Sequence, residues 1–313
     1  MSYVPMTDKD REQVRDLLRG AYDTHVHVDP DLIERRTDDL NLAKAFLDNG
    51  LKGFVLKSHY FATVERAKVV ANAVPGIHAF GAVTLNHAVG GFNPVLVDVA
   101  GRAGARIIWF PTVDAANETA GREDGPVTNK LPFWAKIQRE IHARGIAPAP
   151  LSVVDDEGKV RPDVQTCLEL IKEYDMTLAT GHLGKAEIFA LVEAANQIGV
   201  KRVVVTHALF PAEQFTVDEQ VRLSQMGALI EHCYTTFYTN KCSWETLFAS
   251  VKAVGPDKCV LSSDLGQKVN PSITEGFFDF AHQFLAAGFS PADVRRMAVD
   301  NTTLLVEPDY VFN

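Results

Sequence analysis

The chain of 313 residues has a formal net charge of −9, with 46% hydrophobic and 23% charged residues. This balance is typical of a folded globular protein and excludes a disordered chain. The acidic excess argues against nucleic acid or an anionic membrane as a partner, so we expect a small-molecule substrate. The length suits one large α/β domain covering residues 1–313.

The cysteines and the N-terminal segment bear on the cellular compartment. The four cysteines show no paired CxxC spacing and do not suggest a disulfide framework. The first residues, MSYVPMTDKDREQ, lack the apolar stretch of a signal peptide, and no later run approaches the length of a membrane span. We therefore expect a cytoplasmic protein. The sequence leaves open whether the protein forms a homo-oligomer.

A short amphipathic helix is expected first, over residues 9–19, ahead of the first strand and at the bottom of a barrel. Strand and helix patterns then alternate, which predicts a parallel sheet. The eight predicted strands cover residues 21–27, 53–59, 79–86, 106–112, 177–182, 202–207, 228–232 and 258–264. The predicted helices include residues 38–49, 63–73, 94–103, 131–144, 164–173 and 186–198.

The spacing of the strand ends predicts how the sheet closes. Successive ends lie 25 to 32 residues apart, except for one interval of 70 residues between Thr112 and His182. This regularity over eight strands predicts a (β/α)8 TIM barrel rather than an open sheet. The long interval predicts an insertion at about 114–162, between strands four and five. It contains a polar loop, 114–128, and a small hairpin at 153–160.

Six of the eight predicted strands end in residues that bind metals or move protons, and the carboxyl ends of the strands are where such barrels carry reactive groups. Because His25 and His27 are two residues apart, they point to the same side of their strand and can share one ion. Nitrogen and carboxylate ligands suit Zn²⁺, Mn²⁺, Fe²⁺ or Co²⁺, with zinc as our first expectation. In strand order the residues are His25 and His27, Lys57 and His59, His182, His207, Glu231 and His232, and Asp264.

This order resembles the amidohydrolase superfamily, which has His-x-His on strand one, His on strands five and six, and Asp on strand eight. The resemblance implies a metal-dependent hydrolase that activates water to cleave an amide, cyclic amide, lactone or other ester bond of a small molecule. It implies catalytic roles for Asp264, which moves the proton, and for His207, which is a metal ligand or polarises the scissile carbonyl. The corresponding residues are His25, His27, His182, His207 and Asp264.

Strand four departs from the superfamily pattern. Members with two metal ions usually carry a carboxylated Lys or a Glu there, whereas this chain reads IWFPT at 108–112. Lys57 can supply the bridge from strand two, because neighbouring parallel strands lie only about 4.8 Å apart. Desolvation favours the neutral amine that carboxylation needs. Otherwise Lys57 binds a substrate anion or pairs with Asp23 or Asp264, so one and two metal ions both remain open.

Three further residues, His59, Asn86 and His232, are candidates for contact with the substrate. The missing strand-four ligand keeps a second reading open, in which a single metal ion serves a decarboxylase or an isomerase on the same barrel. A non-catalytic metal-binding barrel is a third reading. The βα loops determine specificity in such folds, so these residues leave the identity of the substrate open.

Overall fold

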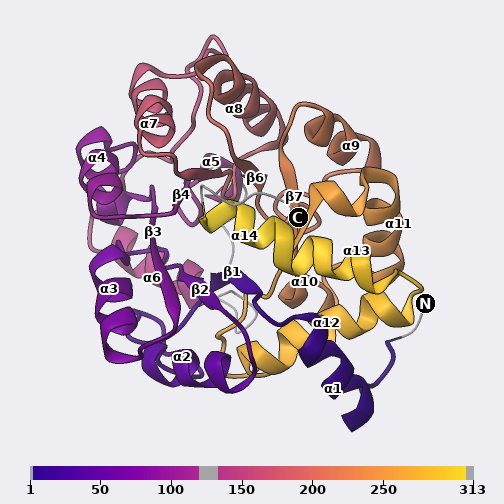
Figure 1. Ribbon diagram of the computed structural model, residues 1–313. Coiled ribbons are helices and arrows are strands. Elements are labelled where there is room, and N and C mark those ends of the chain that lie inside the picture. The colour runs from indigo at the N-terminus through magenta and orange to yellow at the C-terminus, as the bar shows by residue number, and fades with distance from the viewer. Residues whose placement is uncertain (1–2, 120–132, 308–313) are drawn as a thin grey trace.

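The computed structural model describes residues 3–119 and 133–307, which form an eight-stranded barrel surrounded by helices (Figure 1). Neighbouring strands are parallel and follow one another in chain order. A parallel bridge between Val26 and Leu265 joins the last strand to the first. The predicted (β/α)8 fold is therefore confirmed. The strands are β1 Tyr22–Val26, β2 Gly53–Leu56, β3 His78–Thr84, β4 Ile107–Trp109, β5 Thr177–Ala179, β6 Val203–Val205, β7 Leu229–Cys233 and β8 Cys259–Ser262.

Helices follow most of the strands and cover the outside of the barrel (Figure 1). Several begin at side-chain caps; for example, Thr216 accepts a hydrogen bond from Glu219 N at the start of α9. The helices are α1 Asp8–Leu17, α2 Asp39–Asp48, α3 Val64–Ala73, α4 Pro94–Arg102, α5 Ala116–Thr119, α6 Phe133–Ala143, α7 Pro162–Glu173, α8 Lys185–Ile198, α9 Val217–Gln225, α10 Tyr234–Tyr238, α11 Trp244–Val254, α12 Ile273–Ala286, α13 Pro291–Arg295 and α14 Asn301–Val306. Two short 3-10 helices, η1 His87–Val89 and η2 Pro256–Lys258, and one π-helix, η3 Arg296–Asp300, complete the set.

Apolar side chains fill the barrel and the layer around it. The interior cluster takes residues from all eight strands, including Tyr22, Val55, Trp109 and Val260. Two larger clusters lie where the strands pack against the surrounding helices. This double layer makes the barrel a rigid support, so that side chains at the carboxyl ends of the strands are held in place.

The bottom of the barrel is closed by α14, which crosses it in Figure 1. Thr177 Oγ1, at the start of β5, donates to Leu305 O over 2.7 Å, and Asn301 Nδ2 donates to Cys259 O over 2.7 Å. The predicted N-terminal helix forms as α1, but it packs on α12 outside the barrel. The expectation that it lies at the bottom is wrong, because α1 is too polar to be buried there, whereas α14 carries the apolar pair Leu305 and Val306 into the interior.

The segment between β4 and β5 contains the predicted insertion. Residues 120–132 of this insertion, and the first two residues of the helix expected at 131–144, lie outside the described residues. In the described part, a parallel bridge joins Ala115 to Leu151, and an antiparallel bridge joins Val154 to Val160. The insertion is therefore tied to the end of β4, on the side of the barrel where the strands end.

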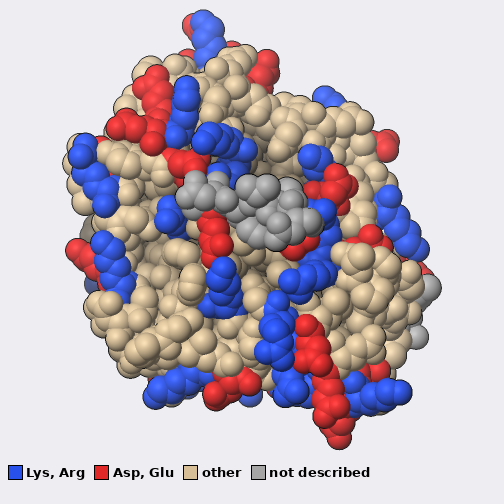
Figure 2. All heavy atoms as spheres, viewed as in Figure 1, with Lys and Arg blue, Asp and Glu red and all other residues tan. Residues whose placement is uncertain are grey.

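Figure 2 shows the face that α14 covers, with acidic and basic side chains interspersed around it. The charges on this face are therefore mixed rather than gathered by sign. Within residues 3–119 and 133–307, no helix is long and apolar enough to cross a membrane.

Candidate metal centre

The six residues expected to bind metal lie at one end of the barrel. His25 belongs to β1, and the other five follow within three residues of the ends of their strands. The backbone turns sharply at two of them, because His207 and Asp264 have φ angles of 27° and 50° in the left-handed region. Backbone strain of this kind concentrates at functional sites. The five others are His27, Lys57, His182, His207 and Asp264.

His25, His27 and Asp264 form the first half of the site. Asp264 Oδ1 lies 3.3 Å from Nε2 of His25 and 3.3 Å from Nε2 of His27. Potential ligand atoms of the three residues all lie within 4.8 Å of one another, which is close enough for one ion to reach all of them. Closure of the barrel brings them together, since Asp264 N donates to His25 O over 2.9 Å.

His182 and His207 form the second half. Their Nε2 atoms are 3.2 Å apart, and their ring centroids are 4.9 Å apart. The His207 ring also stacks on that of His25, with a centroid separation of 6.0 Å. The two halves are therefore neighbours within one buried site.

Buried carboxylates face the outer nitrogens of three of these histidines. Glu213 Oε2 lies 3.2 Å from His207 Nδ1, and Glu118 Oε2 lies 3.6 Å from His182 Nδ1. An ionised carboxylate in this position orients a metal-binding imidazole and keeps its proton on Nδ1, which leaves the Nε2 lone pair for the ion. Burial and the nearby Glu118 raise the pKa of Glu213 well above its usual value.

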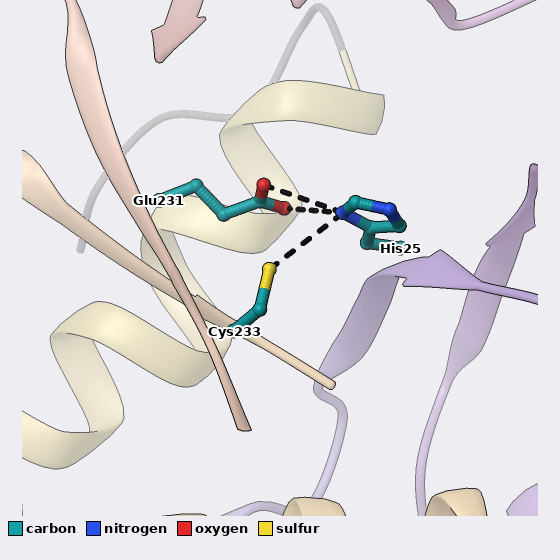
Figure 3. A group of neighbouring side chains, drawn as sticks. All are labelled: His25, Glu231 and Cys233. Carbon is teal, nitrogen blue, oxygen red and sulfur yellow. Dashed lines mark hydrogen bonds and ion pairs between the residues drawn. The ribbon is translucent and has the colours of Figure 1, made fainter. Parts of the chain in front are cut away.

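The third carboxylate, Glu231, points at His25 Nδ1 with both oxygens, at 3.2 and 3.3 Å (Figure 3). Cys233 Sγ approaches the same nitrogen to 3.7 Å. Glu231 also accepts hydrogen bonds from Ser262 Oγ over 2.7 Å and from His207 N over 3.0 Å. Contact with His25 and these hydrogen bonds hold the pKa of Glu231 below its usual value despite burial. An ionised Glu231 only accepts, so the proton of His25 lies on Nδ1 and its Nε2 lone pair faces the site.

His27 differs from the other three histidines, because its Nδ1 faces Arg35 Nη2 at 3.4 Å. Arg35 therefore takes the position behind this ring that a carboxylate takes behind the other three, while Nε2 of His27 faces Asp264 at 3.3 Å. Desolvation and the neighbouring Arg35 lower the pKa of His27 to about 3. Its ring is therefore neutral at neutral pH, which metal binding requires.

Burial is also the main cause of the low pKa values of His182 and His207, although Glu118 raises the former slightly. Asp264 behaves in the opposite way to an isolated buried acid. Burial alone would raise its pKa, but contacts with His25, His27 and Lys57 hold it well below the usual value. The site therefore combines neutral imidazoles with an ionised carboxylate, a donor set that suits Zn²⁺.

Lys57 reaches the middle of the site from β2. Its Nζ lies 2.8 Å from His25 Nε2 and 5.3 Å from the centre of the Trp109 ring. Trp109 comes from β4, so the strand that offers no metal-binding side chain in the sequence contributes an aromatic ring beside Lys57. Burial lowers the pKa of Lys57, against the pull of Asp264 and Glu231.

A cavity of about 310 Å³ opens onto the site, and its wall includes five of the six expected ligands, all but His25. Of the three residues expected to contact substrate, His59 lines this cavity, and its Nδ1 lies 2.9 Å from Thr112 Oγ1. Asn86 does not line it, because its amide is used to hold His59 O and Thr112 in place.

His232 does not line the cavity either. Side chains alternate along β7, so Glu231 faces the site and His232 faces away from it. Both ring nitrogens of His232 are buried without a hydrogen-bond partner among the described residues. The placement of Asn86 and His232 in the substrate site is therefore corrected.

Three side chains around the centre were not among the expected site residues, namely Arg35, Glu118 and Glu213, and the role of a fourth, Glu231, was not predicted. Glu231 precedes His232 at a strand end, so its position was visible in the sequence but its role was not. The other three come from loops or short helices after β1, β4 and β6. Only the folded chain brings them to the imidazoles.

Solved structures with the same barrel provide the comparison with known proteins. An amidohydrolase from Pseudomonas aeruginosa matches with a TM-score of 0.63 and 9% identity, covering 95% of this chain and 98% of that one. The probable dipeptidase PvdM from Pseudomonas aeruginosa has a TM-score of 0.62 and 12% identity, with coverage of 95% and 97%. The organophosphorus hydrolase from Deinococcus radiodurans has a TM-score of 0.55 and 13% identity, with coverage of 92% of each chain.

These likenesses are likenesses of fold, and they agree with the predicted (β/α)8 barrel. No curated protein sequence matches the chain. A family model described as "Family of unknown function (DUF6282)" matches residues 20–231, which is more than half of the sequence. The chain therefore belongs to the DUF6282 family.

Proposed function

We propose that the protein is a metal-dependent hydrolase that cleaves an amide, lactone or other ester bond of a small molecule. The observation that carries the proposal is the direction of the imidazole lone pairs. Glu231 fixes the lone pair of His25 on Nε2, and the Nε2 atoms of His182 and His207 face each other at 3.2 Å with carboxylates behind both rings. Two lone pairs at this distance repel unless a cation or a proton lies between them.

The residues present fit a divalent ion. His25, His27 and Asp264, whose ligand atoms lie within 4.8 Å of one another, would hold it together with the neighbouring His182 and His207. Zinc is the first expectation from this set of nitrogen and oxygen donors. When bound, such an ion supplies a Lewis acid that makes water more acidic and polarises a carbonyl group. The similar structures named above as hydrolases agree with this proposal, although their likeness is one of fold.

Asp264 is the residue that moves the proton in this proposal. Its low pKa keeps the carboxylate ionised at neutral pH, so it accepts a proton from the attacking water. The same low basicity lets it pass that proton on to the leaving group. His59 lies beside His27, with their rings stacked at 5.1 Å, and lines the cavity where a substrate would be placed.

Hydrolysis of a panel of small amides, lactones and esters by the zinc-loaded protein tests the proposal. Chelation should abolish the activity and added zinc should restore it. Asp264→Asn should keep bound zinc but lower turnover by about 10²–10⁴, the usual contribution of a positioned proton-transfer group. Asp257→Asn, an exposed position in η2, is the matched control and should change nothing.

Unchanged turnover in Asp264→Asn would remove Asp264 from the mechanism. Metal-dependent release of CO₂ from a carboxylic acid, without hydrolysis of any substrate in the panel, would favour a decarboxylase instead.

A further inference from the structure

The wall of the active-site cavity differs in charge from the molecule as a whole. The chain carries a net charge of −9, yet the described residues that line this cavity include three basic side chains and one carboxylate, Asp264. A positive lining in an acidic protein focuses the local potential on anions. Arg35 and Lys241 are the cations of this wall, and the third basic side chain is the buried Lys57.

Arg35 is held rigidly with part of its guanidinium unused. Its Nε and Nη2 donate to Asp31 Oδ2 over 2.9 and 2.7 Å, and Nη2 also faces His27. The residue is only 6% exposed and lines the cavity. Among the residues that the structure describes, no hydrogen bond satisfies its Nη1. This part of the guanidinium can therefore donate to an acceptor on a ligand in the cavity.

Lys241 stands on another part of the same wall. Its Nζ lies 4.0 Å from the centre of the Phe210 ring, and that ring lies 4.9 Å from the ring of His207. Phe210 therefore holds the lysine chain on the cavity side, next to the metal-binding histidines. The backbone of Lys241 is fixed as well, through its hydrogen bond to Thr236 O.

We propose that the substrate carries a carboxylate, which Arg35 and Lys241 bind while its scissile carbonyl faces Asp264. This inference rests on the proposed hydrolase function of the same cavity. Asp31 offsets the charge of Arg35, so the subsite favours a monoanion such as a carboxylate over a phosphate dianion. The volume of about 310 Å³ is at the low end for ligand cavities, which restricts the substrate to a small molecule. Acylated amino acids and lactones that carry a carboxyl group satisfy both conditions.

Binding of N-acetylglycine and of its neutral isostere N-acetylglycinamide to the zinc-loaded protein, measured by calorimetry, tests the subsite. A charge-assisted hydrogen bond is worth about 1.5 kcal/mol or more, so N-acetylglycine should bind at least about tenfold more tightly. Lys241→Met should remove most of this preference and leave the affinity for N-acetylglycinamide unchanged. Arg35→Lys, which keeps the charge but loses Nη1, should also weaken N-acetylglycine selectively.

Lys252→Met is the matched control. Lys252 is another exposed lysine over an aromatic ring, 5.6 Å from the centre of Phe289, but it belongs to α11 and does not line the cavity. This variant carries the same change of charge and should bind both compounds as the unmodified protein does. Equal binding of the two compounds, or an unchanged preference in Lys241→Met, would overturn the carboxylate subsite.

The binding measurement separates this inference from the hydrolase proposal. Turnover of neutral and carboxylate-bearing substrates at equal kcat/KM would keep the hydrolase and remove the subsite. Binding of N-acetylglycine that depends on Lys241, without hydrolysis of any compound in the panel, would keep the subsite and remove the hydrolase.

Discussion

The imidazole of His25 makes polar contacts through both of its nitrogens, and these contacts define the chemistry around it. Glu231 lies on the Nδ1 side and Lys57 on the Nε2 side, at 3.2 and 2.8 Å. Cys233 also approaches Nδ1, so His25, Glu231 and Cys233 form a second group with metal-binding side chains (Figure 3). Glu231 already accepts hydrogen bonds from Ser262 and His207 N. We therefore interpret it as the group that orients His25 rather than as a ligand.

Glu231→Gln tests this interpretation. The amide presents donors where His25 and Ser262 donate, so His25 loses its fixed tautomer and zinc affinity should fall by about 10- to 100-fold. Cys233→Ser, at the other side chain facing Nδ1, should keep zinc affinity within about twofold, because that sulfur orients no lone pair toward the ion. Competition with a chromogenic zinc chelator measures both. Loss of zinc in Cys233→Ser but not in Glu231→Gln would make Cys233 a ligand.

Lys57 decides between one ion and two. Its position beside His25 and its lowered pKa favour reaction of a neutral amine with CO₂, which would give a carbamate able to bridge two ions. We expect a carbamate carbonyl signal in the ¹³C NMR spectrum after incubation with zinc and ¹³C-bicarbonate. Lys57→Met should lack the signal and bind one zinc ion fewer. A second ion in Lys57→Met would show that the bridge is not needed.

The strand ends could be predicted from the sequence, but the carboxylates behind them could not. His25, His27, His182, His207 and Asp264 stand out because they recur at a regular period. Glu118 and Glu213 have no such period, since one lies in a short helix of the insertion and the other in the loop after β6. The prediction for His232 failed for a local reason. The side of β7 on which His232 lies depends on where the strand enters the barrel, and the preceding residue, Glu231, points inward instead.

At the scale of elements, the loops after the strands hold the ligands in place. Apart from β7, the strands end earlier than predicted, and the chain then turns at His207 and Asp264 with positive φ angles. After Asp264, Gly266 has a φ of 137°, and a Cβ atom there would lie 1.7 Å from His27 O. Only a glycine lets the β8–α12 loop pass this close to β1. Apolar periodicity carries no information on such turns, which is why the predicted strands extend beyond the ends of the observed ones.

Gly266→Ala should therefore disturb the metal centre. The added methyl group forces the loop away from His27 O, which separates Asp264 from the imidazoles, and zinc affinity should fall at least about tenfold as the site geometry is lost. Gly288→Ala is the matched control, since Gly288 also has a positive φ of 86° but has no atom within 4 Å of its Cβ position. Gly288→Ala should lower the free energy of unfolding by only about 1 kcal/mol. Equal zinc affinity in the two variants, measured by dialysis, would contradict the argument.

For the whole molecule, the number and order of strands follow from the sequence, whereas the closing contacts do not. The strand-then-helix pattern recurs eight times in the sequence. Because each parallel strand needs a helical crossover before the next strand, this repetition predicts a barrel of parallel strands. The helix that closes the bottom, α14, is short and lies far along the chain from β5, which it contacts through Thr177. A contact between such distant segments leaves no periodic trace. We therefore predicted the polar α1, rather than α14, at the bottom of the barrel.

Buried histidines make the stability of the whole molecule depend on pH. Burial lowers the pKa of His232 to about 4 and, with Arg35, that of His27 to about 3, whereas the unfolded chain binds these protons near pH 6.5. The unfolded state therefore binds more protons between these values, and the free energy of unfolding should rise from pH 4 to 6.5. Asp23 opposes this trend, because burial raises its pKa to about 7 and the folded state takes up a proton there.

His232→Gln isolates one of these contributions outside the metal centre. It should reduce the slope of the free energy of unfolding against pH by about one proton, or ~1.4 kcal/mol per pH unit between roughly pH 4.5 and 6. Urea unfolding of the metal-free protein at several pH values in this window measures the slope. The same slope in the variant and the unmodified protein would mean that His232 titrates alike in the folded and unfolded states.

The central claim is that four histidines from three strands, together with Asp264, hold a divalent ion. Equilibrium dialysis against zinc, followed by elemental analysis, tests it most directly. We expect one or two tightly bound ions per chain, with binding lost in a His25→Asn/His27→Asn double variant. A His78→Asn/His87→Asn variant, which removes two histidines outside the cavity wall, should retain the ions. Absence of bound zinc, manganese, iron and cobalt from the unmodified protein, or retention of zinc in His25→Asn/His27→Asn, would contradict the account.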